Sequence, residues 1–509
     1  MAKKQYRYPL AGPYNTRVVS SLPGSSGIVG AGIVGVMIVG KTAQTSNKDR
    51  RFINVWSETV VNQANNTKTM YLVKRPGFAL SATPQAGSIG NALLVWSGQG
   101  AGTKVISAFG ATNSSIYDGE TQLVTNHSNT AIITGKATGI TETSISSTPT
   151  IAITSSDNTA WYYQDAGTVT KITDADFPGN NSLTLAGTFA HMDGYAFIMD
   201  TTGNIYNSDV NSLTSWAASS LIPCNSYPDL GVGCIRRGNN IIGFGTQTIQ
   251  FFRNAGNAFG SVLQRIEEMT LKIGCVGANA IATIGDSIYW TGSTPEGGLS
   301  VYKMSDGVKP ISTPEINRIL QLAGASNITM TSAKIYGRSF VILNASTLTF
   351  VYCEEEGLWH EWTSSQGVLW NKCAGVSTGS SQVTYAISNT LTGGKVYVIN
   401  PTSYVFTDDS QPYTATAQSA LIGDGNVRTF WRDMTLLADQ EGSSSPMSVH
   451  VSDDDYESST LLGTVDLSMA RPRLTACGSA YRRSWVFTHS AATSFRIEAM
   501  VGTLEEGSH

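Results

Sequence analysis

A short sequence pattern, or phrase, occurs repeatedly between residues 189 and 305. It reads FAHMDGYAFIMDTTGNIYNS over residues 189–208, RGNNIIGFGTQTIQFF over residues 237–252, and IATIGDSIYW over residues 281–290 with LSVY at 299–302. Each copy contains two runs of alternating apolar residues joined by a corner of Gly with Asp or Asn. Side chains of a strand point alternately to opposite faces, and tight hairpin corners need the positive φ that Gly and Asn tolerate. The repeats therefore predict a meander of antiparallel β-hairpins.

The end of this phrase, an apolar residue or Trp followed by Tyr, recurs through much of the chain. The marks are Tyr117, Tyr162, Tyr206, Tyr302, Tyr352 and Tyr397, with Gln250 standing in the one gap. Successive marks are separated by 45, 44, 44, 52, 50 and 45 residues. A unit of about 40–50 residues without a helical period is typical of four-stranded propeller blades. We therefore expect an all-β protein that contains a β-propeller of six or seven blades.

Composition agrees with this fold class and restricts the function. Only 14% of the 509 residues are charged and 51 are Gly, as expected for many short strands joined by tight turns. The net charge is −4 with no long basic run, so the chain lacks the basic face of a sequence-reading nucleic-acid binder. The six Cys residues have no metal-ligand spacing, and we expect them to be buried reduced thiols. The amino terminus has no apolar segment of a secretory signal, so we expect the chain to remain where it is made.

The pattern changes along the chain and suggests three domains. Residues 1–90 are predicted to be an N-terminal arm and linking segment, and residues 91–405 the β-propeller. Residues 406–509 contain longer strands with wider polar loops, which favours a C-terminal β-sandwich. One helix is expected at residues 313–322, where Thr313 can cap the helix and Pro314 occupies its first turn.

The most apolar stretch reads GIVGAGIVGVMIVG over residues 27–40. It is too short for a membrane span, which needs roughly 20 residues. Its Gly30, Gly32 and Gly35 match a dinucleotide fingerprint formally, but the β-branched residues that follow do not favour the required helix. We favour a Gly-spaced strand pair or a loop packed between subunits. The predicted interface residues, taken from this stretch, are Ile28, Ile33, Val34 and Ile38.

Three other sequence features are candidates for chemical sites. Asp453–Asp455 could bind Ca²⁺, but a solvated loop explains them as well, because the Gly and distal Glu of a dedicated calcium loop are missing. Glu354–Trp362 places carboxylates beside aromatic residues, as in a sugar-cleaving cleft, but it follows a blade corner where Trp packing is ordinary. The pairs Arg236–Arg237 and Arg482–Arg483 could meet phosphate, although surface charge is the simpler interpretation. We therefore predict no catalytic residue, no metal site, no cofactor and no enzymatic activity.

Two phrases resemble a known family. The first is RRFINVWSE at residues 50–58 followed by MYLVKRPGF at 70–78; the second is IGFGTQTIQFFRNAGN at 242–257 followed by KIGCVG at 272–277. Both resemble, in the expected order, phrases of the packaged-DNA stabilisation proteins, the tail hubs or nozzles of short-tailed bacteriophages. The resemblance covers loosely residues 45–500, whereas residues 1–45 depart from it. Neither phrase is a catalytic motif.

The resemblance implies a structural virion protein. Its implied role is a tail ring, expected to be a homohexamer, that extends the portal and adaptor channel, retains packaged DNA and conducts it during ejection. Its implied partners are adaptor and portal proteins above, tail fibre, spike or needle proteins below, and genomic double-stranded DNA passing without sequence recognition. It would be assembled in the bacterial host cytoplasm and have no stable membrane span. The alternative is a carbohydrate-binding or glycoside-cleaving propeller protein of a phage tail.

Overall fold

The computed structural model describes residues 4–9, 52–62, 67–96, 104–118, 133–146, 148–165, 167–224, 226–364, 370–378, 381–388, 394–423 and 425–506. The chain divides into two compact units. Unit 1 comprises residues 1–79, 348–367 and 402–509, and unit 2 comprises residues 80–347 and 368–401. Unit 2 is therefore inserted, in sequence, between the segments of unit 1.

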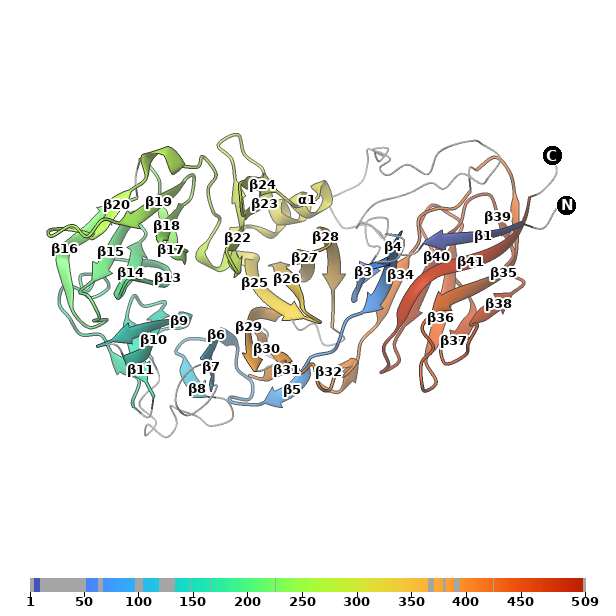
Figure 1. Ribbon diagram of the computed structural model, residues 1–509, viewed down its shortest axis with the longest axis horizontal. Helices are drawn as coiled ribbons and strands as arrows, with labels where there is room; N and C mark the ends of the chain where they lie inside the picture. Colours follow the sequence, from blue (N-terminus) through green and yellow to red (C-terminus); the bar gives the residue numbers. More distant parts are fainter. Residues whose placement is uncertain are drawn as a thin grey trace. The chain divides into compact units, whose positions relative to one another are not determined.

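The described part of unit 2 is built from seven sheets that follow one another around a centre (Figure 1). The first three sheets are β6 (Gly90–Trp96), β7 (Lys104–Phe109) and β8 (Ser115–Asp118); β9 (Ala137–Ile145), β10 (Thr148–Ser155), β11 (Ala160–Gln164) and β12 (Thr170–Lys171); and β13 (Leu185–Met192), β14 (Tyr195–Asp200), β15 (Asn204–Ser208) and β16 (Trp216–Pro223). The next two are β17 (Gly231–Arg237), β18 (Asn240–Gly245), β19 (Ile249–Asn254) and β20 (Leu263–Arg265); and β21 (Ile281–Ile284), β22 (Ser287–Ser293), β23 (Leu299–Met304) and β24 (Val308–Pro310). The sixth contributes β25 (Ile328–Ile335) and β26 (Arg338–Ala345), and the seventh is β29 (Trp370–Thr378), β30 (Ser381–Ser388), β31 (Val396–Ile399) and β5 (Ala79–Ala82).

The seven sequence marks correspond to seven blades. Each mark lies in the third strand of a successive group in chain order: Tyr117 in β8, Tyr162 in β11, Tyr206 in β15, Gln250 in β19, Tyr302 in β23, Tyr352 in β27 (Leu348–Cys353) and Tyr397 in β31. Several of these residues are buried because the third strand packs between neighbours; Tyr117 and Tyr397, for example, are 1% and 3% exposed. The predicted β-propeller is thus confirmed, and of the two blade numbers allowed by the sequence the structure has seven.

The last blade is completed by a strand from an earlier part of the chain. Its sheet order is β29-β30-β31-β5, so residues 79–82 pair within a sheet otherwise made from residues 370–399. This arrangement fixes both ends of the propeller segment in one sheet.

The predicted C-terminal β-sandwich lies in unit 1, and strands that precede the propeller in sequence also belong to it. One sheet has the order β3 (Val55–Asn62), β4 (Thr67–Lys74), β41 (Arg496–Glu506), β35 (Thr429–Ala438) and β38 (Arg473–Thr475), with β1 (Lys4–Pro9) on β41 and β39 (Ser479–Ala480) on β35. In the other sheet, the strands that belong to unit 1 have the order β27, β28 (Leu358–Trp362), β2 (Phe52–Ile53), β34 (Ala415–Gln418), β40 (Ser484–His489), β36 (Pro446–Ser452) and β37 (Thr460–Asp466). The strands β32 (Thr407–Asp408) and β33 (Gln411–Pro412) form a separate hairpin.

The two sheets of unit 1 enclose one hydrophobic core. Trp431 of β35 and Trp485 of β40 meet edge to face with ring centroids 5.1 Å apart. Phe52 and Leu72, which precede the propeller in sequence, belong to the same core. The sandwich therefore uses strands from both sides of the inserted propeller.

The structure confirms the predicted helix, α1 (Pro314–Ala323), which is the one α-helix among the described residues. The Thr313 hydroxyl caps it by accepting from the Ile316 backbone N–H at 3.5 Å, and Pro314 occupies the first turn. Ile316 and Leu320 are fully buried, as expected for residues four apart on one helix face. Three short 3₁₀ turns are η1 (Glu267–Met269), η2 (Ala278–Ala280) and η3 (Ala325–Asn327).

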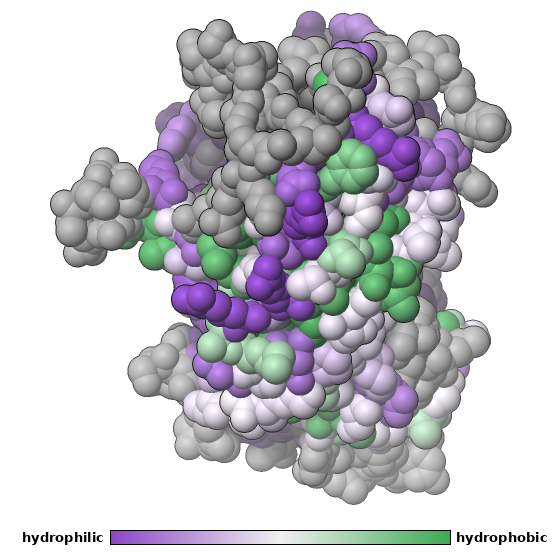
Figure 2. Space-filling view, turned by 90° about the vertical axis from the view of Figure 1, so that its right-hand side faces the viewer, coloured by the Kyte–Doolittle hydropathy of each residue, from purple (hydrophilic) through white to green (hydrophobic). Residues whose placement is uncertain are grey.

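Large hydrophobic side chains are also exposed on unit 1, including Phe430, Leu461, Met469 and Tyr481. On the face drawn in Figure 2, hydrophobic residues stand in small groups among hydrophilic ones. Such scattered exposure is normal for a soluble surface and by itself indicates no particular partner.

Candidate functional site

A cavity of about 480 Å³ lies at the centre of the propeller. Every blade contributes to its wall, mostly through its innermost strand: Leu93 of β6, Thr138 and Ile140 of β9, Thr188 of β13, Cys234 of β17, Asn279 of η2, Ala282 of β21, Met330 and Thr331 of β25, and Lys372 of β29. Because seven inner strands converge here, small side chains and hydroxyl groups dominate the wall. The size is that of a small-molecule site, for which about 300–1,000 Å³ is usual.

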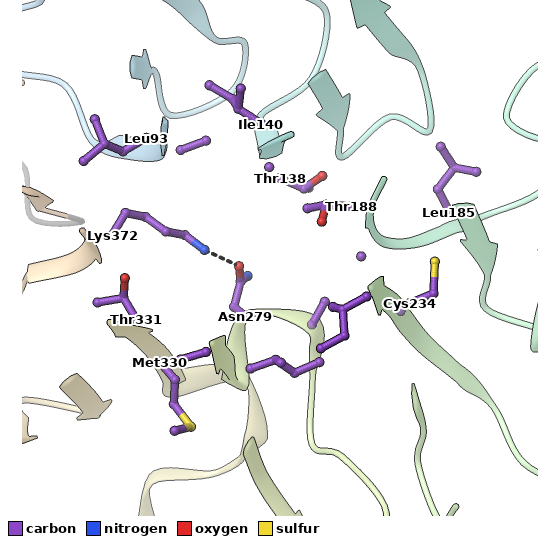
Figure 3. A pocket seen from close by; sticks show the side chains of 18 of the residues that line it. Leu93, Thr138, Ile140, Leu185, Thr188, Cys234, Asn279, Met330, Thr331 and Lys372 are labelled. Atoms are coloured by element: carbon purple, nitrogen blue, oxygen red, sulfur yellow. Dashed lines mark hydrogen bonds between the residues drawn. The ribbon is translucent and has the colours of Figure 1, made fainter. Parts of the chain in front are cut away.

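Lys372 carries the one charge among the described residues that line this cavity, and no carboxylate is present among them. Its Nζ donates a hydrogen bond of 2.9 Å to Asn279 Oδ1 across the cavity wall (Figure 3). Burial lowers the pKa of Lys372 from 10.5 to about 8, and nearby Lys136 contributes in the same direction. The cavity thus presents an ammonium group that no acidic side chain of its described wall neutralises.

Glycines allow the inner strands to approach closely around the cavity. A Cβ at Gly139 would lie 1.9 Å from Cγ2 of Thr188, and one at Gly187, whose φ is +77°, would lie 3.0 Å from Cα of Gly233. Any larger side chain at Gly139 would collide with the neighbouring blade. These positions therefore help to set the spacing of the second, third and fourth blades.

The phrases RRFINVWSE and MYLVKRPGF form a buried polar cluster in unit 1. Arg75 is fully buried, and its Nη1 and Nη2 donate to the two carboxylate oxygens of Asp408 at 2.9 and 2.5 Å. Its Nε donates to Asn54 Oδ1 at 2.8 Å, and its guanidinium carbon lies 3.9 Å from the ring centroid of Tyr413. Asn54 has a φ of +59°, which Asn tolerates better than most residues. The polar residues of these phrases are thus engaged in contacts that stabilise the fold of unit 1.

Lys74 extends this cluster. Its Nζ donates to the carbonyl oxygens of Ala491 and Thr493 at 2.6 and 3.2 Å and lies 3.2 Å from His489 Nδ1. Burial lowers the pKa of Lys74 to about 7, and burial together with the Lys74 charge lowers the pKa of His489 to about 3. His489 is therefore neutral near pH 7, and its Nδ1 accepts from Lys74 while Nε2–H donates to Ser445 Oγ at 2.9 Å.

The Glu354–Trp362 stretch also has a structural environment. Glu356 accepts hydrogen bonds from the backbone N–H and the hydroxyl of Thr59 in β3, at 2.9 and 2.6 Å. Trp359 and Trp362 are each 2% exposed. His360 is fully buried, which lowers its pKa to about 3. The carboxylate of Glu356 therefore binds β3, the edge strand of its sheet. The aromatic residues pack in the interior of unit 1.

Two of the three carboxylates in the Asp453–Asp455 loop form ion pairs with arginines. Asp453 forms an ion pair with Arg483 at 2.6 Å and Asp455 one with Arg482 at 3.2 Å. Asp454 accepts from the Ser458 hydroxyl and backbone, which lowers its pKa to about 2. The described residues contain no group of three or more acidic, His or Cys side chains that could hold a metal ion.

Arg236 and Arg237 likewise bind backbone. The Nε of Arg236 donates to the Gly238 carbonyl oxygen at 2.8 Å, and Arg237 donates to the carbonyl oxygens of Asp286 and Ser305 at 2.8 and 2.5 Å. The structure therefore does not bring the two arginine pairs into the cavity. The predicted interface residues Ile28, Ile33, Val34 and Ile38 lie outside the described residues.

Comparison with known proteins decides the family. Residues 58–378, more than half of the chain, match the family model Phage_stabilise, which is described as Bacteriophage P22 Gp10, beta-propeller. The chain belongs to this family. It is therefore a structural protein of bacteriophage particles, from a family that stabilises packaged DNA. The matched residues include the Lys74–Arg75 phrase and both parts of the second phrase, which agrees with the resemblance seen in the sequence.

Two other comparisons add no functional information. No curated protein matches the chain. A crystal structure of Raptor from Chaetomium thermophilum is similar at 8% identity with a TM-score of 0.36, covering 64% of this chain and 29% of that one. A similarity this low carries no argument about this phage family member. No helix among the described residues is long and apolar enough to cross a membrane.

The KIGCVG phrase of this family member connects two blades. The Cys275 backbone N–H donates to the Gly245 carbonyl oxygen at 2.9 Å, and that of Gly274 donates to the Ser293 carbonyl oxygen at 2.9 Å. A Cβ at Gly274 would lie 1.8 Å from the carbonyl oxygen of Thr246. Gly is therefore required at this position, because the chain passes directly against the neighbouring backbone.

Sequence reasoning missed Lys372 and Asn279, the polar pair of the cavity. Neither residue stands in a recognisable motif, and they are 93 positions apart. Their positions in the chain could have identified them. Each residue lies in, or just before, the first strand of a blade, and the first strands surround the centre of a propeller.

Proposed function

We propose that this chain is the subunit of a tail nozzle or hub ring that extends the portal and adaptor channel, retains packaged DNA and conducts it during ejection. The family match over residues 58–378 is the observation that carries the proposal, because it makes the chain a structural phage protein. The proposed partners are adaptor and portal proteins above and tail fibre, spike or needle proteins below. Assembly would take place in the cytoplasm of the bacterial host.

The size of the central cavity supports a channel formed by several subunits. A cavity of about 480 Å³ lined by side chains holds a small molecule, whereas the major groove of duplex DNA alone is about 12 Å wide. DNA therefore has no route through a single propeller. A closed ring with cyclic symmetry, which we propose to be a hexamer, would enclose the duplex between subunits and would use two different patches of each chain.

We further propose that the chain acts without enzymatic activity. A glycoside-cleaving site requires two carboxyl groups about 5–10 Å apart across the sugar-binding cleft. The described residues around the propeller cavity include no carboxylate, and Glu356 is engaged by Thr59. These observations favour a structural role over the carbohydrate-cleaving alternative.

The apolar stretch at residues 27–40 is proposed as one subunit contact, through Ile28, Ile33, Val34 and Ile38. An apolar run on a soluble protein is usually covered by a partner. Replacing Ile33 and Val34 with Asp should prevent ring formation and leave the propeller folded. Replacing Thr45 and Ser46 with Asp adds the same charge outside the apolar stretch and should leave assembly intact. Assembly of the Ile33 and Val34 variant would remove this stretch from the interface.

Electron microscopy of the purified chain mixed with its portal and adaptor proteins tests the proposed function. The proposal expects closed rings stacked coaxially on the adaptor, with an axial opening wide enough for duplex DNA. Chains that remain monomeric in this mixture, or that attach to the outside of the tail as isolated subunits, would contradict it.

A further inference from the structure

We propose that the cavity at the centre of the propeller is a binding site for a small anion carrying a phosphate or carboxylate group, with Lys372 as its counter-charge and Asn279 as a second donor. This site is separate from the proposed ring contacts, because it lies inside one chain. Its existence can therefore be tested on the free protein whether or not the ring proposal is correct.

The charge of Lys372 has no counter-charge in the described wall of the cavity. Among the described residues its Nζ makes one hydrogen bond, to the neutral amide of Asn279, and the described residues of the wall include no Asp or Glu. Lys372 is half-buried, so a solute can reach it, and partial removal of an ammonium group from water is costly unless the charge is paired. That cost is visible in the pKa of Lys372, which burial lowers to about 8. An anion in the cavity would supply the missing partner and favour the charged ammonium form.

The Asn279 amide is oriented with its oxygen toward Lys372. Its Oδ1 accepts from Lys372 Nζ, so the amide NH₂ group remains to donate. Asn279 is exposed, so this NH₂ group is accessible to a solute, and no acceptor for it lies among the described residues. Lys372 and Asn279 thus together offer several N–H donors at one position, which is the arrangement that a carboxylate or phosphate oxygen requires.

The wall opposite Lys372 carries hydroxyl groups. Figure 3 shows Thr138 and Thr188 on the side of the cavity that faces Lys372 and Asn279. Thr138 donates to Thr154 at 2.8 Å, whereas the Thr188 hydroxyl makes no hydrogen bond to any described residue. Since the Thr188 methyl group lies against Gly139, its hydroxyl is the group left to contact a ligand. The wall therefore favours a polar ligand over a purely apolar one.

The volume sets the size of that ligand. About 480 Å³ accommodates a molecule as large as a nucleoside monophosphate or citrate, and Gly139, Gly187 and Gly233 keep the inner strands free of side chains that would reduce this space. A polymer such as duplex DNA is too large. The ligand is accordingly a small solute, either a free phosphate compound or a free carboxylate.

Isothermal titration calorimetry with the purified full chain tests the site, using inorganic phosphate, adenosine monophosphate and citrate as separate probes. We expect saturable binding of at least one probe at one site per chain. Saturation by phosphate and the nucleotide identifies a phosphate site, and saturation by citrate alone identifies a carboxylate site. Lys372→Gln should weaken binding at least about tenfold, because a hydrogen bond to a charged group is lost.

Asn279→Asp is the second variant, since it keeps the shape of the side chain and leaves Lys372 in place. It puts a carboxylate beside the ammonium group, so it should also weaken anion binding at least about tenfold. Lys309→Gln removes the same charge from the exposed outer strand β24 and should bind as the unmodified chain does. Circular dichroism of each variant verifies the strand content. The proposal is overturned if no probe saturates at about 10 mM, or if Lys372→Gln and Asn279→Asp bind as tightly as the unmodified chain.

Discussion

Arg75 and Asp408 form a bidentate ion pair whose two side chains are 0% and 6% exposed. In sequence they stand on opposite sides of the propeller, because unit 2 begins at Leu80 and ends at Pro401. The pair therefore joins the segment that leads into the propeller to the segment that follows it. Asp408 also accepts from the backbone N–H of Phe78 at 3.0 Å, which fixes the first residues after the KRPG phrase.

Asp408→Asn should destabilise unit 1 by about 3–5 kcal/mol, because it leaves the Arg75 charge buried without a counter-charge. Adding Arg75→Met removes that charge, while the amide oxygen introduced at position 408 can still accept from the Phe78 N–H, so the double variant should regain part of the loss. Hydrogen exchange of peptides from β3 and β4 during denaturant titration reports on this unit. If the double variant loses more stability than the two single variants lose in total, this result would argue against charge burial as the cause.

Gly274→Ala should lower the stability of the propeller, because its Cβ would lie 1.8 Å from the Thr246 carbonyl oxygen and the two blades must move apart. We expect about 2–4 kcal/mol, the range of severe packing changes. Gly277→Ala is the matched control: its φ of 173° is extended and a Cβ there meets nothing within 4 Å, so a change of at most about 0.5 kcal/mol is expected. Equal thermal unfolding temperatures for Gly274→Ala and Gly277→Ala would refute the proposed close contact.

The stability of unit 1 should decrease as the pH falls below 6.5. The pKa of His360 is about 3 in the folded protein and 6.5 in its ordinary state, so between these values the unfolded chain binds a proton that the folded chain does not. At pH 5 this difference corresponds to about 2 kcal/mol. His489, whose folded pKa is also about 3, should act in the same direction.

His360→Leu should reduce this loss between pH 7.5 and pH 5, and it should not destabilise the protein at pH 7.5. Neither ring nitrogen of His360 has a hydrogen-bond partner among the described residues, so an apolar residue suits the position. Denaturant unfolding at the two pH values measures the effect, with His450→Leu in β36 as the control. An unchanged pH dependence in His360→Leu would show that this imidazole is not responsible.

The free chain should bind duplex DNA weakly and without sequence preference at physiological salt. A conduit that neutralised many phosphates with Lys and Arg would bind tightly, with a steep dependence on salt, and would hinder sliding. The chain carries a net charge of −4, and both arginine pairs are engaged within the protein. Fluorescence anisotropy with a short duplex measures the affinity. Submicromolar binding would favour a DNA-binding function over a passive channel.

The local features of the fold could be predicted from the sequence. Alternating residues and Gly corners predicted the hairpins, the spacing of Tyr117 to Tyr397 matched the third strands of successive blades, and Thr313 with Pro314 gave the start of α1. These features succeed because a strand, a turn and a helix cap depend on neighbouring residues.

Contacts between distant residues could not be predicted in the same way. Arg75 and Asp408 are separated by 333 positions, and Lys372 and Asn279 by 93. Their meeting depends on which strands pair across an insertion and on how seven blades close into a ring, and neither relationship leaves a periodic signal in one sequence. The role of the KRPG phrase as a buried cluster was therefore visible only in the structure.

Genome retention in particles made without this chain tests whether the chain retains packaged DNA. Phage heads would be filled with DNA in cells in which the gene for this chain is inactivated, and the DNA that remains inside purified particles would be measured by nuclease protection. We predict that packaged DNA is lost and becomes nuclease-sensitive, and that supplying the chain during assembly restores protection. Particles that remain filled and sealed without the chain would contradict the account.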